Sequence, residues 1–245
     1  MIRLENIEKK YGSFQALHPL NLHVRKGEVF GFLGPNGAGK TTTIRMLAGV
    51  LVPTAGTVAI NGIDLVKEPI ESKKHVGYIP DRPYLYDKLT AREFLQFVGG
   101  MYGLSPDEIR ARGELLLKEN GLLDRADELI EAYSHGMKQR LVLTSSLLHR
   151  PQLLIVDEPM VGLDPHGAKR IKEQFRTIAN EGRTVFLSTH SLDVAQEVCD
   201  RVGILFKGRL IALGAVQDLL NDQSSKDLEE VFLKITQEEL EKSQP

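Results

Sequence analysis

The first third of the chain alternates short apolar runs with turn-forming residues. That pattern is typical of β-strands, and it predicts three of them, over residues 2–8, 20–25 and 28–33. The last run ends in glycine and carries four large apolar residues, Val29, Phe30, Phe32 and Leu33. Because residues 29–33 form a short run without charged or polar side chains, they predict a strand that is buried on both faces.

Helical and strand patterns follow one another along the rest of the chain. A helix is predicted over residues 40–50, and the segment 56–60 with the Asn61-Gly62 pair predicts a strand and a tight turn. From residue 90 to about 150 the periodicity is helical and strand signals are absent. Four apolar runs then predict strands, over residues 153–156, 184–188, 202–206 and 210–213.

This order of elements predicts an α/β fold. Strands that alternate with helices indicate a mainly parallel sheet joined by right-handed crossovers. The strand-rich start predicts an N-terminal antiparallel β subdomain, and the helical stretch predicts an inserted subdomain at about residues 85–150. We expect one domain over residues 1–220 and a short helical extension over 221–245. The extension places four apolar residues on one face: Leu228, Val231, Phe232 and Ile235.

Composition limits the classes of protein to consider. The chain has 245 residues, of which 42% are hydrophobic and 26% charged, and these values are ordinary for a globular protein. The net charge is -2 with scattered Lys and Arg, so no nucleic-acid partner is expected. An apolar signal core is lacking, and no run approaches the roughly 18 apolar residues of a spanning helix. With Cys199 as the only cysteine, these features predict a cytoplasmic protein without disulfides or a cysteine-based zinc site.

Residues 34–41, GPNGAGKT, match the phosphate-binding pattern G-x-x-x-x-G-K-[ST] between a predicted strand and a predicted helix. The glycines permit backbone angles that let successive N–H groups point at phosphate oxygens beside the helix N-terminus. Lys40 would reach the β- and γ-phosphates. Thr41 would ligate Mg²⁺, and Thr42 lies beside it on the α-phosphate side. The predicted nucleotide-binding residues are Gly34, Pro35, Asn36, Gly37, Ala38, Gly39, Lys40, Thr41 and Thr42.

Two acids directly follow the apolar run at residues 153–156. A buried strand that ends in carboxylates brings them to the edge of the sheet where ligands bind. Asp157 fits the Mg²⁺-water ligand that partners Thr41, and Glu158 fits the general base that orients and deprotonates the attacking water. Adjacent residues of a strand point to opposite faces, so one metal ion cannot easily take both acids. That geometry favours two separate roles.

These two motifs also occur in kinases, GTPases and helicases, so the family depends on a third. Residues 133–141, YSHGMKQRL, resemble the signature of ATP-binding cassette (ABC) proteins, whose common form is L-S-G-G-M-K-Q-R. The resemblance implies that this loop begins a helix whose N-terminus favours an anion. It implies that Ser134 and Gly136 contact the γ-phosphate of ATP bound to a second cassette. The expected assembly is a head-to-tail homodimer or heterodimer with two ATP molecules at its interface.

Further motifs of the ABC family follow in order. Tyr11 resembles the aromatic residue that stacks on adenine, and residues 162–165, GLDP, resemble the D-loop, which brings Asp164 to the partner subunit. His190 in STHSL resembles the switch histidine that contacts the γ-phosphate and acts with Glu158 in catalysis. The resemblance covers residue 2 to about residue 215 and implies a P-loop NTPase core that binds ATP and Mg²⁺.

Three positions depart from the family pattern. Asp81 in GYIPDRP stands where most members carry the Q-loop glutamine, and it could still hold a Mg²⁺-bound water with a different reach. His135 replaces the first glycine of the signature, and Val161 replaces a small polar residue before the D-loop. None of the three removes the groups that activate the nucleophile, so active hydrolysis is expected.

The resemblance implies a subunit that powers transport by a separate membrane permease. The permease would contact about residues 81–103, where Tyr84, Tyr86 and Phe94 could face it or form local core, and would hold the chain on the inner face of the membrane. The run DEPMVGLDP at 157–165 and the C-terminal EEVFLKIT resemble bacterial exporter ATPases. An importer cassette and a soluble ABC ATPase, such as one of iron–sulfur assembly, are the alternatives.

Overall fold

The computed structural model describes residues 1–82, 84–160 and 165–242. Across these residues, six strands form the central sheet in the order β10-β9-β3-β8-β7-β6. All neighbours are parallel except β9 and β10, which are antiparallel. The strand bounds are Val76–Ile79 (β6), Leu153–Asp157 (β7), Thr184–Thr189 (β8), Val29–Leu33 (β3), Arg201–Phe206 (β9) and Arg209–Ala215 (β10). The predicted α/β fold is confirmed, because the sheet is mixed and mostly parallel.

The central strands β3, β7 and β8 are buried at every position. Along β7, Leu153 and Ile155 join one hydrophobic cluster, and Leu154 and Val156 join the other. Alternate side chains of a strand point to opposite faces, so an unbroken apolar run is what a sheet covered on both faces requires. Because the strands are parallel, β3, β7 and β8 end at the same edge of the sheet.

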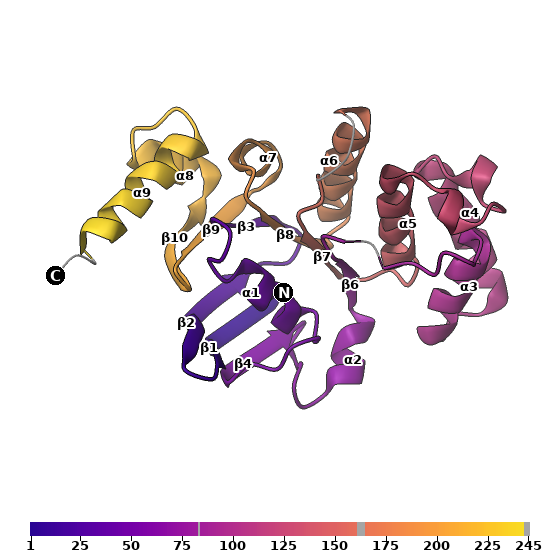
Figure 1. The fold of residues 1–245 in the computed structure, drawn as a ribbon, viewed down its shortest axis with the longest axis horizontal. Coiled ribbons are helices and arrows are strands. Elements are labelled where there is room, and N and C mark those ends of the chain that lie inside the picture. Colours follow the sequence, from indigo (N-terminus) through magenta and orange to yellow (C-terminus); the bar gives the residue numbers. More distant parts are fainter. Residues whose placement is uncertain (83, 161–164, 243–245) are drawn as a thin grey trace.

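A second, antiparallel sheet covers one face through helix α1 (Lys40–Leu47). Its order is β2-β1-β4-β5, with bounds Phe14–Val24 (β2), Ile2–Tyr11 (β1), Ala55–Ile60 (β4) and Ile63–Asp64 (β5). The predicted Asn61-Gly62 turn joins β4 to β5, and both residues have positive φ, 53° and 83°. Figure 1 shows this sheet and α1 below the central sheet.

A helical subdomain is inserted between β6 and β7, at the right of Figure 1. It contains α3 (Ala91–Met101), α4 (Pro106–Glu119), two short 3-10 turns (Leu123–Arg125 and Ile130–Ala132) and α5 (His135–Leu147). Helices α3 and α4 begin with capping boxes, in which Thr90 and Ser105 exchange hydrogen bonds with Glu93 and Glu108. Such boxes satisfy N–H groups that a helix start otherwise leaves unpaired.

Helices α6 (Pro165–Asn180) and α7 (Leu192–Val198) follow β7 and β8, and α8 (Val216–Asp222) and α9 (Leu228–Lys242) close the chain. In α9, Leu228 and Val231 are buried, and Phe232 and Ile235 pack against the core, so the predicted apolar face is confirmed. Within the described residues, no helix has the length and apolar character needed to span a bilayer.

The sequence prediction did not include the two-residue strand β5, helix α2 (Pro69–Lys74) or strand β6, which lies at the edge of the central sheet. Strand β6 has only four residues, and they include Gly77 and the half-buried Tyr78. The apolar pattern that would predict a buried strand is therefore weak. A Cβ at Gly77 would lie 2.6 Å from the carbonyl oxygen of Ser146, so close packing against α5 requires glycine there.

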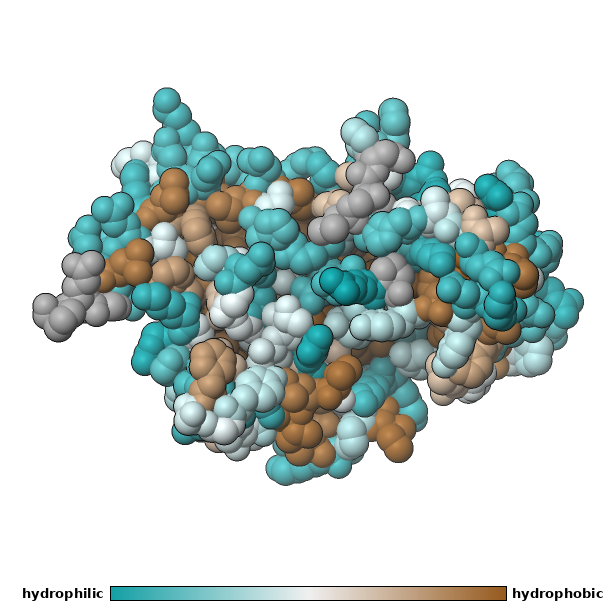
Figure 2. Space-filling view, viewed as in Figure 1, coloured by the Kyte–Doolittle hydropathy of each residue, from teal (hydrophilic) through white to brown (hydrophobic). Residues whose placement is uncertain are grey.

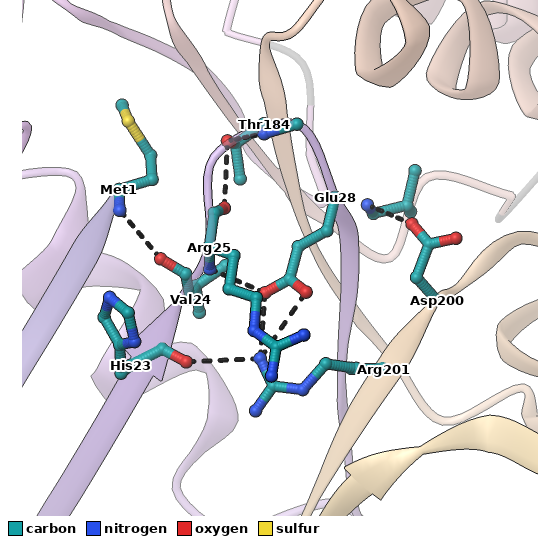
Figure 3. A network of polar contacts seen from close by, with 10 residues as sticks. Met1, His23, Val24, Arg25, Glu28, Thr184, Asp200 and Arg201 are labelled. Atoms are coloured by element: carbon teal, nitrogen blue, oxygen red, sulfur yellow. Dashed lines mark hydrogen bonds and ion pairs between the residues drawn. The ribbon is translucent and has the colours of Figure 1, made fainter.

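A polar network ties together the amino ends of the central strands (Figure 3). The Glu28 carboxylate, nearly buried, accepts hydrogen bonds from the Arg25 backbone N–H at 2.7 Å and from Arg201 Nη1 at 3.0 Å. Thr184 accepts from the N–H of Gly27, and Asp200 accepts from the N–H of Val29. The network lies at the start of β3, so it is separate from the strand ends where ligands are expected.

His149, just after α5, is expected to make stability pH-dependent. Its ring stacks on Tyr102 with 3.6 Å between centroids, and its Nε2 lies 3.0 Å from the carbonyl oxygen of Val76. Burial lowers the pKa of His149 to about 4, so between pH 6.5 and 4 the unfolded chain binds a proton that the folded chain does not. Stability therefore falls as pH falls through this window, by roughly 2 kcal/mol between pH 6.5 and 4.5.

Urea unfolding of the protein and of His149→Phe at these two pH values measures this contribution. The variant keeps an aromatic ring against Tyr102 and loses the titrating group, so its stability should vary less with pH by about that amount. Equal pH dependence in the two proteins would show that His149 does not account for the effect.

Candidate functional site

The glycine-rich loop between β3 and α1 has a backbone that other residues would strain. Gly39 precedes α1 with φ 107°, and a Cβ at Gly34 would lie 2.2 Å from the carbonyl oxygen of Leu205. Lys40 is buried, and its Nζ donates to the carbonyl oxygens of Gly34 at 2.6 Å and Pro35 at 3.2 Å. The lysine is thus folded back over its own loop, with its amino group held where the chain turns.

One cavity of about 350 Å³ collects most of the predicted site residues. It is lined by Tyr11, Phe14, Ala16, Asn36, Gly37, Gly39, Lys40, Thr41, Thr42, Asp81, Asp157 and Glu158. The predicted residues come from four places in the chain: the end of β1, the loop before α1, the segment after β6 and the end of β7. Gly34, Pro35 and Ala38 belong to the same loop but not to the lining.

The acids and Lys40 influence one another across this cavity. Burial raises the pKa of Asp157, and the charges of Asp81 and Glu158 raise it further, whereas the nearby Ser188 hydroxyl and the charge of Lys40 lower it. Burial lowers the pKa of Lys40, and Glu158 and Asp157 oppose that change. Asp81 therefore acts electrostatically on Asp157 although 76 positions separate them (157 − 81).

Glu158 does not lie on the strand that delivers it. Strand β7 ends at Asp157, and Glu158 follows with φ 50°, a left-handed conformation that is uncommon for a residue with a side chain. The alternation of side chains along a strand therefore stops at Asp157, and both carboxylates line the same cavity. Strain of this kind is often found at functional sites, where the surrounding structure holds it.

The end of strand β8 holds the Glu158 carboxylate. His190 Nδ1 lies 2.9 Å from Glu158 Oε1, and the Thr189 hydroxyl donates to Oε2 at 3.2 Å. The N–H of His190 also donates to Oε2, at 3.4 Å. The predicted pair Glu158 and His190 is therefore in direct contact, and Thr189 is a neighbour that the sequence prediction did not include.

Two aromatic residues line one part of the cavity. Tyr11 and Phe14 pair across the turn between β1 and β2, and both are largely exposed. Lys9 Nζ lies 5.3 Å from the centroid of the Tyr11 ring, within the range of a cation–π contact. The sequence prediction did not include Phe14 and Ala16. Because they lie opposite the end of β1 in the hairpin, their closeness to Tyr11 could have identified them.

The signature loop lies at the start of α5, as predicted. Ser134 is the N-cap, and its hydroxyl accepts from the N–H of Met137 at 3.3 Å. His135, which replaces the first glycine of the signature, is exposed. Ser134 and Gly136 do not line the cavity, so one copy of the chain does not bring them to the phosphate loop. Asp164, with Val161, lies outside the described residues.

Ion pairs connect the segment after Asp81 to the signature region. Lys138 of α5 lies 2.7 Å from Asp87, and Lys88 lies 2.6 Å from Glu131. Backbone hydrogen bonds reinforce these contacts, because the N–H groups of residues 130 and 131 donate to the carbonyl oxygens of residues 89 and 87. The segment is therefore bonded to the loop that leads into α5.

The predicted permease-contact segment is divided between surface and core. Tyr84 is 81% exposed and Tyr86 is 59% exposed, whereas Phe94 is buried in the core of the helical subdomain. Phe97 and Met101 of α3 are also exposed, and Tyr86 packs edge-on against Phe97. In Figure 2, hydrophobic residues also gather at the lower edge, where Figure 1 draws α2.

A phosphate loop and two acids at the carboxyl end of a parallel strand define the class as a P-loop NTPase. Residues 17–161 match the family described as ABC transporter. A linearmycin resistance ATP-binding protein of Bacillus subtilis is 41% identical over 89% of this chain and 70% of that protein. This chain therefore belongs to the ATP-binding subunits of ABC transporters, and it is an ATP hydrolase.

Two solved structures are similar to this chain. An ATP-binding subunit of an ABC transporter has TM-score 0.90 and 33% identity, covering 96% of this chain and 99% of the other. A dimeric post-hydrolysis state of an ATP-binding cassette bound to ADP and Pi has TM-score 0.80 and 27% identity, covering 88% of this chain and 98% of the other. The cassette in the second of these structures is thus a dimer.

Proposed function

We propose that the cavity is the site of ATP hydrolysis and that its residues have the roles their chemistry suggests. The main support for this proposal is that Tyr11 lines the same cavity as Lys40, Thr41, Asp157 and Glu158. The exposed ring of Tyr11 stacks on adenine, and Lys40 leaves its own loop to bind the β- and γ-phosphates. The N–H groups of residues 34–42 bind the phosphates beside the start of α1.

The oxygen donors in the cavity fit Mg²⁺. The Thr41 hydroxyl and the Asp157 carboxylate are hard oxygen ligands, and Asp81 adds a third oxygen donor. Among the described residues, no three His, Cys, Asp or Glu side chains are grouped to hold a metal ion alone. This agrees with a site that uses phosphate oxygens for its other ligands, as Mg²⁺ commonly does. Bound there, Mg²⁺ would neutralise charge developing on the phosphates.

We assign the proton transfer to Glu158. Its carboxylate accepts a proton from the attacking water, and His190 turns from Glu158 Oε1 to the γ-phosphate. Ser134 and Gly136 of a second cassette, and Asp164 at the D-loop, complete the site from the partner's side. The N-terminus of α5 supports this role, because its first N–H groups favour an anion. The dimer, formed by like or unlike cassettes, then holds two ATP molecules at its interface.

We propose that the chain powers export through a separate permease that contacts about residues 81–103. The exposed Tyr84, Tyr86 and Met101 support this contact, and the resistance function named for the Bacillus subtilis relative supports export. The cassette would occupy residues 1–220, with the C-terminal extension over 221–245, on the inner face of the membrane. No residue favours the importer or the iron–sulfur assembly ATPase specifically.

The permease contact is tested by affinity purification from detergent-solubilised membranes of the source organism. We expect one membrane-spanning polypeptide to co-purify and to be retained several-fold less by the Tyr84→Ser/Met101→Ser variant. Leu233→Ser, which also changes an exposed hydrophobic residue, is the matched control on α9. Retention that is equal in all three proteins, or no membrane-spanning partner at all, would contradict the proposed contact.

A further inference from the structure

Thr189 contacts the proposed base, Glu158, but has no role in the mechanism proposed above. It is the last residue of β8, it is 2% exposed, and it pairs with Leu33 of the neighbouring strand. Its hydroxyl donates to Glu158 Oε2 and accepts a hydrogen bond from the N–H of Ser191 at 3.0 Å. A hydroxyl has one proton to donate, so the bond from Ser191 directs that proton toward Glu158.

The two side chains that hold Glu158 differ in freedom. His190 lies beyond the strand with 58% of its side chain exposed, whereas Thr189 is fixed in the sheet. When His190 contacts the γ-phosphate, it leaves Glu158 Oε1 free for the attacking water. The Thr189 hydroxyl and the His190 N–H then still hold Oε2, and of these the Thr189 bond is the shorter, 3.2 Å against 3.4 Å.

The backbone of Glu158 adds to the need for such a contact. Glu158 follows β7 with a left-handed φ, and its own N–H donates to the carbonyl oxygen of Ser188, also in β8. Both its main chain and its carboxylate are therefore placed by β8 rather than by β7. We propose that Thr189 is a positioning residue whose hydroxyl fixes the Glu158 carboxylate with Oε1 toward the attacking water. This inference rests on the proposed role of Glu158 as the base.

Removing the hydroxyl while keeping the shape tests the inference. Thr189→Val is expected to lower kcat about 10- to 100-fold with little change in KM for ATP, because a misplaced base slows chemistry more than binding. Thr189→Ser keeps the hydroxyl and should restore most of the rate. Thr184→Val makes the same change at the other end of β8, in the network that Figure 3 shows, and should leave kcat near its normal value.

A double variant separates positioning from a structural effect. In the Glu158→Gln background, Thr189→Val should cause no further loss of kcat, because there is no base left to position. Circular dichroism checks folding, and Thr189→Ala, with a smaller side chain, carries the same test if Thr189→Val does not fold. A normal kcat in the folded hydroxyl-free variant, or an equal loss in Thr189→Ser, would overturn the inference.

The outcomes also distinguish this inference from the proposed function. Normal turnover in Glu158→Gln would show that Glu158 is not the base, and the proposed mechanism would fail. Loss of turnover in Glu158→Gln together with normal turnover in Thr189→Val would overturn the role of Thr189 alone.

Discussion

Glu158→Gln is expected to stop ATP hydrolysis while leaving ATP binding intact. The amide has nearly the shape of the carboxylate, and it can still accept from Thr189, but it cannot take a proton from water. A positioned general base typically increases a rate about 10²- to 10⁴-fold, so kcat should fall by at least about 100-fold. Because the nucleotide is no longer cleaved, the ATP-bound dimer should persist.

Phosphate release, nucleotide binding and gel filtration with ATP measure the three parts of this result. Glu197→Gln is the matched control, because it makes the same change at an exposed acid of α7 that pairs with Lys172. It should hydrolyse ATP normally and show no ATP-stabilised dimer. Unchanged turnover in Glu158→Gln would refute the assignment of the base, and lost nucleotide binding would place Glu158 in binding instead.

Arg201→Met is expected to destabilise the fold by about 3–5 kcal/mol without changing the nucleotide site. The substitution removes the cation that lies 3.0 Å from the Glu28 carboxylate, whose side chain is only 9% exposed. The N–H of Arg25 still donates a hydrogen bond to that carboxylate. Removing one member of a buried ion pair costs this much because the other charge is left uncompensated. The guanidinium carbon also lies 5.7 Å from the centroid of the Phe30 ring, a contact that the variant loses.

Urea unfolding of Arg201→Met and of Arg201→Met/Glu28→Leu gives the measurement. The double variant removes both charges, so it should recover most of the lost free energy of unfolding. Arg183→Met is the matched control, because Arg183 pairs with the exposed Glu181, and such a pair contributes about 0–1 kcal/mol. A loss in the double variant as large as in the single one would indicate that packing, rather than the unpaired charge, dominates.

The elements predicted best from the sequence are those whose residues are selected mainly by burial. Strands β3, β7 and β8 are covered on both faces, so each contains a run of apolar residues and the signal is strong. Strand β6 also serves the site, since Asp81 follows it closely, but it has only four residues, and one of them is Gly77, which close packing against α5 requires. A local pattern does not contain that tertiary requirement.

The candidate site shows the same division. The residues of the cavity were predictable where a continuous motif carries them, as with Lys40 and Thr41. Phe14 and Thr189 were missed because their roles depend on neighbours in space: Phe14 lies opposite Tyr11 in a hairpin, and Thr189 contacts a residue from another strand. The left-handed turn at Glu158 was likewise not readable from alternation along β7.

The two ion pairs after Asp81 have a consequence for how force would pass through the molecule. A pull on the exposed Tyr86 would pass through the ion pair of Asp87 with Lys138, one turn into α5, as well as back along the chain toward Asp81. In the proposed head-to-tail dimer, Asp81 serves the ATP of its own cassette, and the start of α5 serves the ATP of the other. One short segment would then be connected to both ATP sites of the dimer. A single permease contact would therefore act on both sites at once.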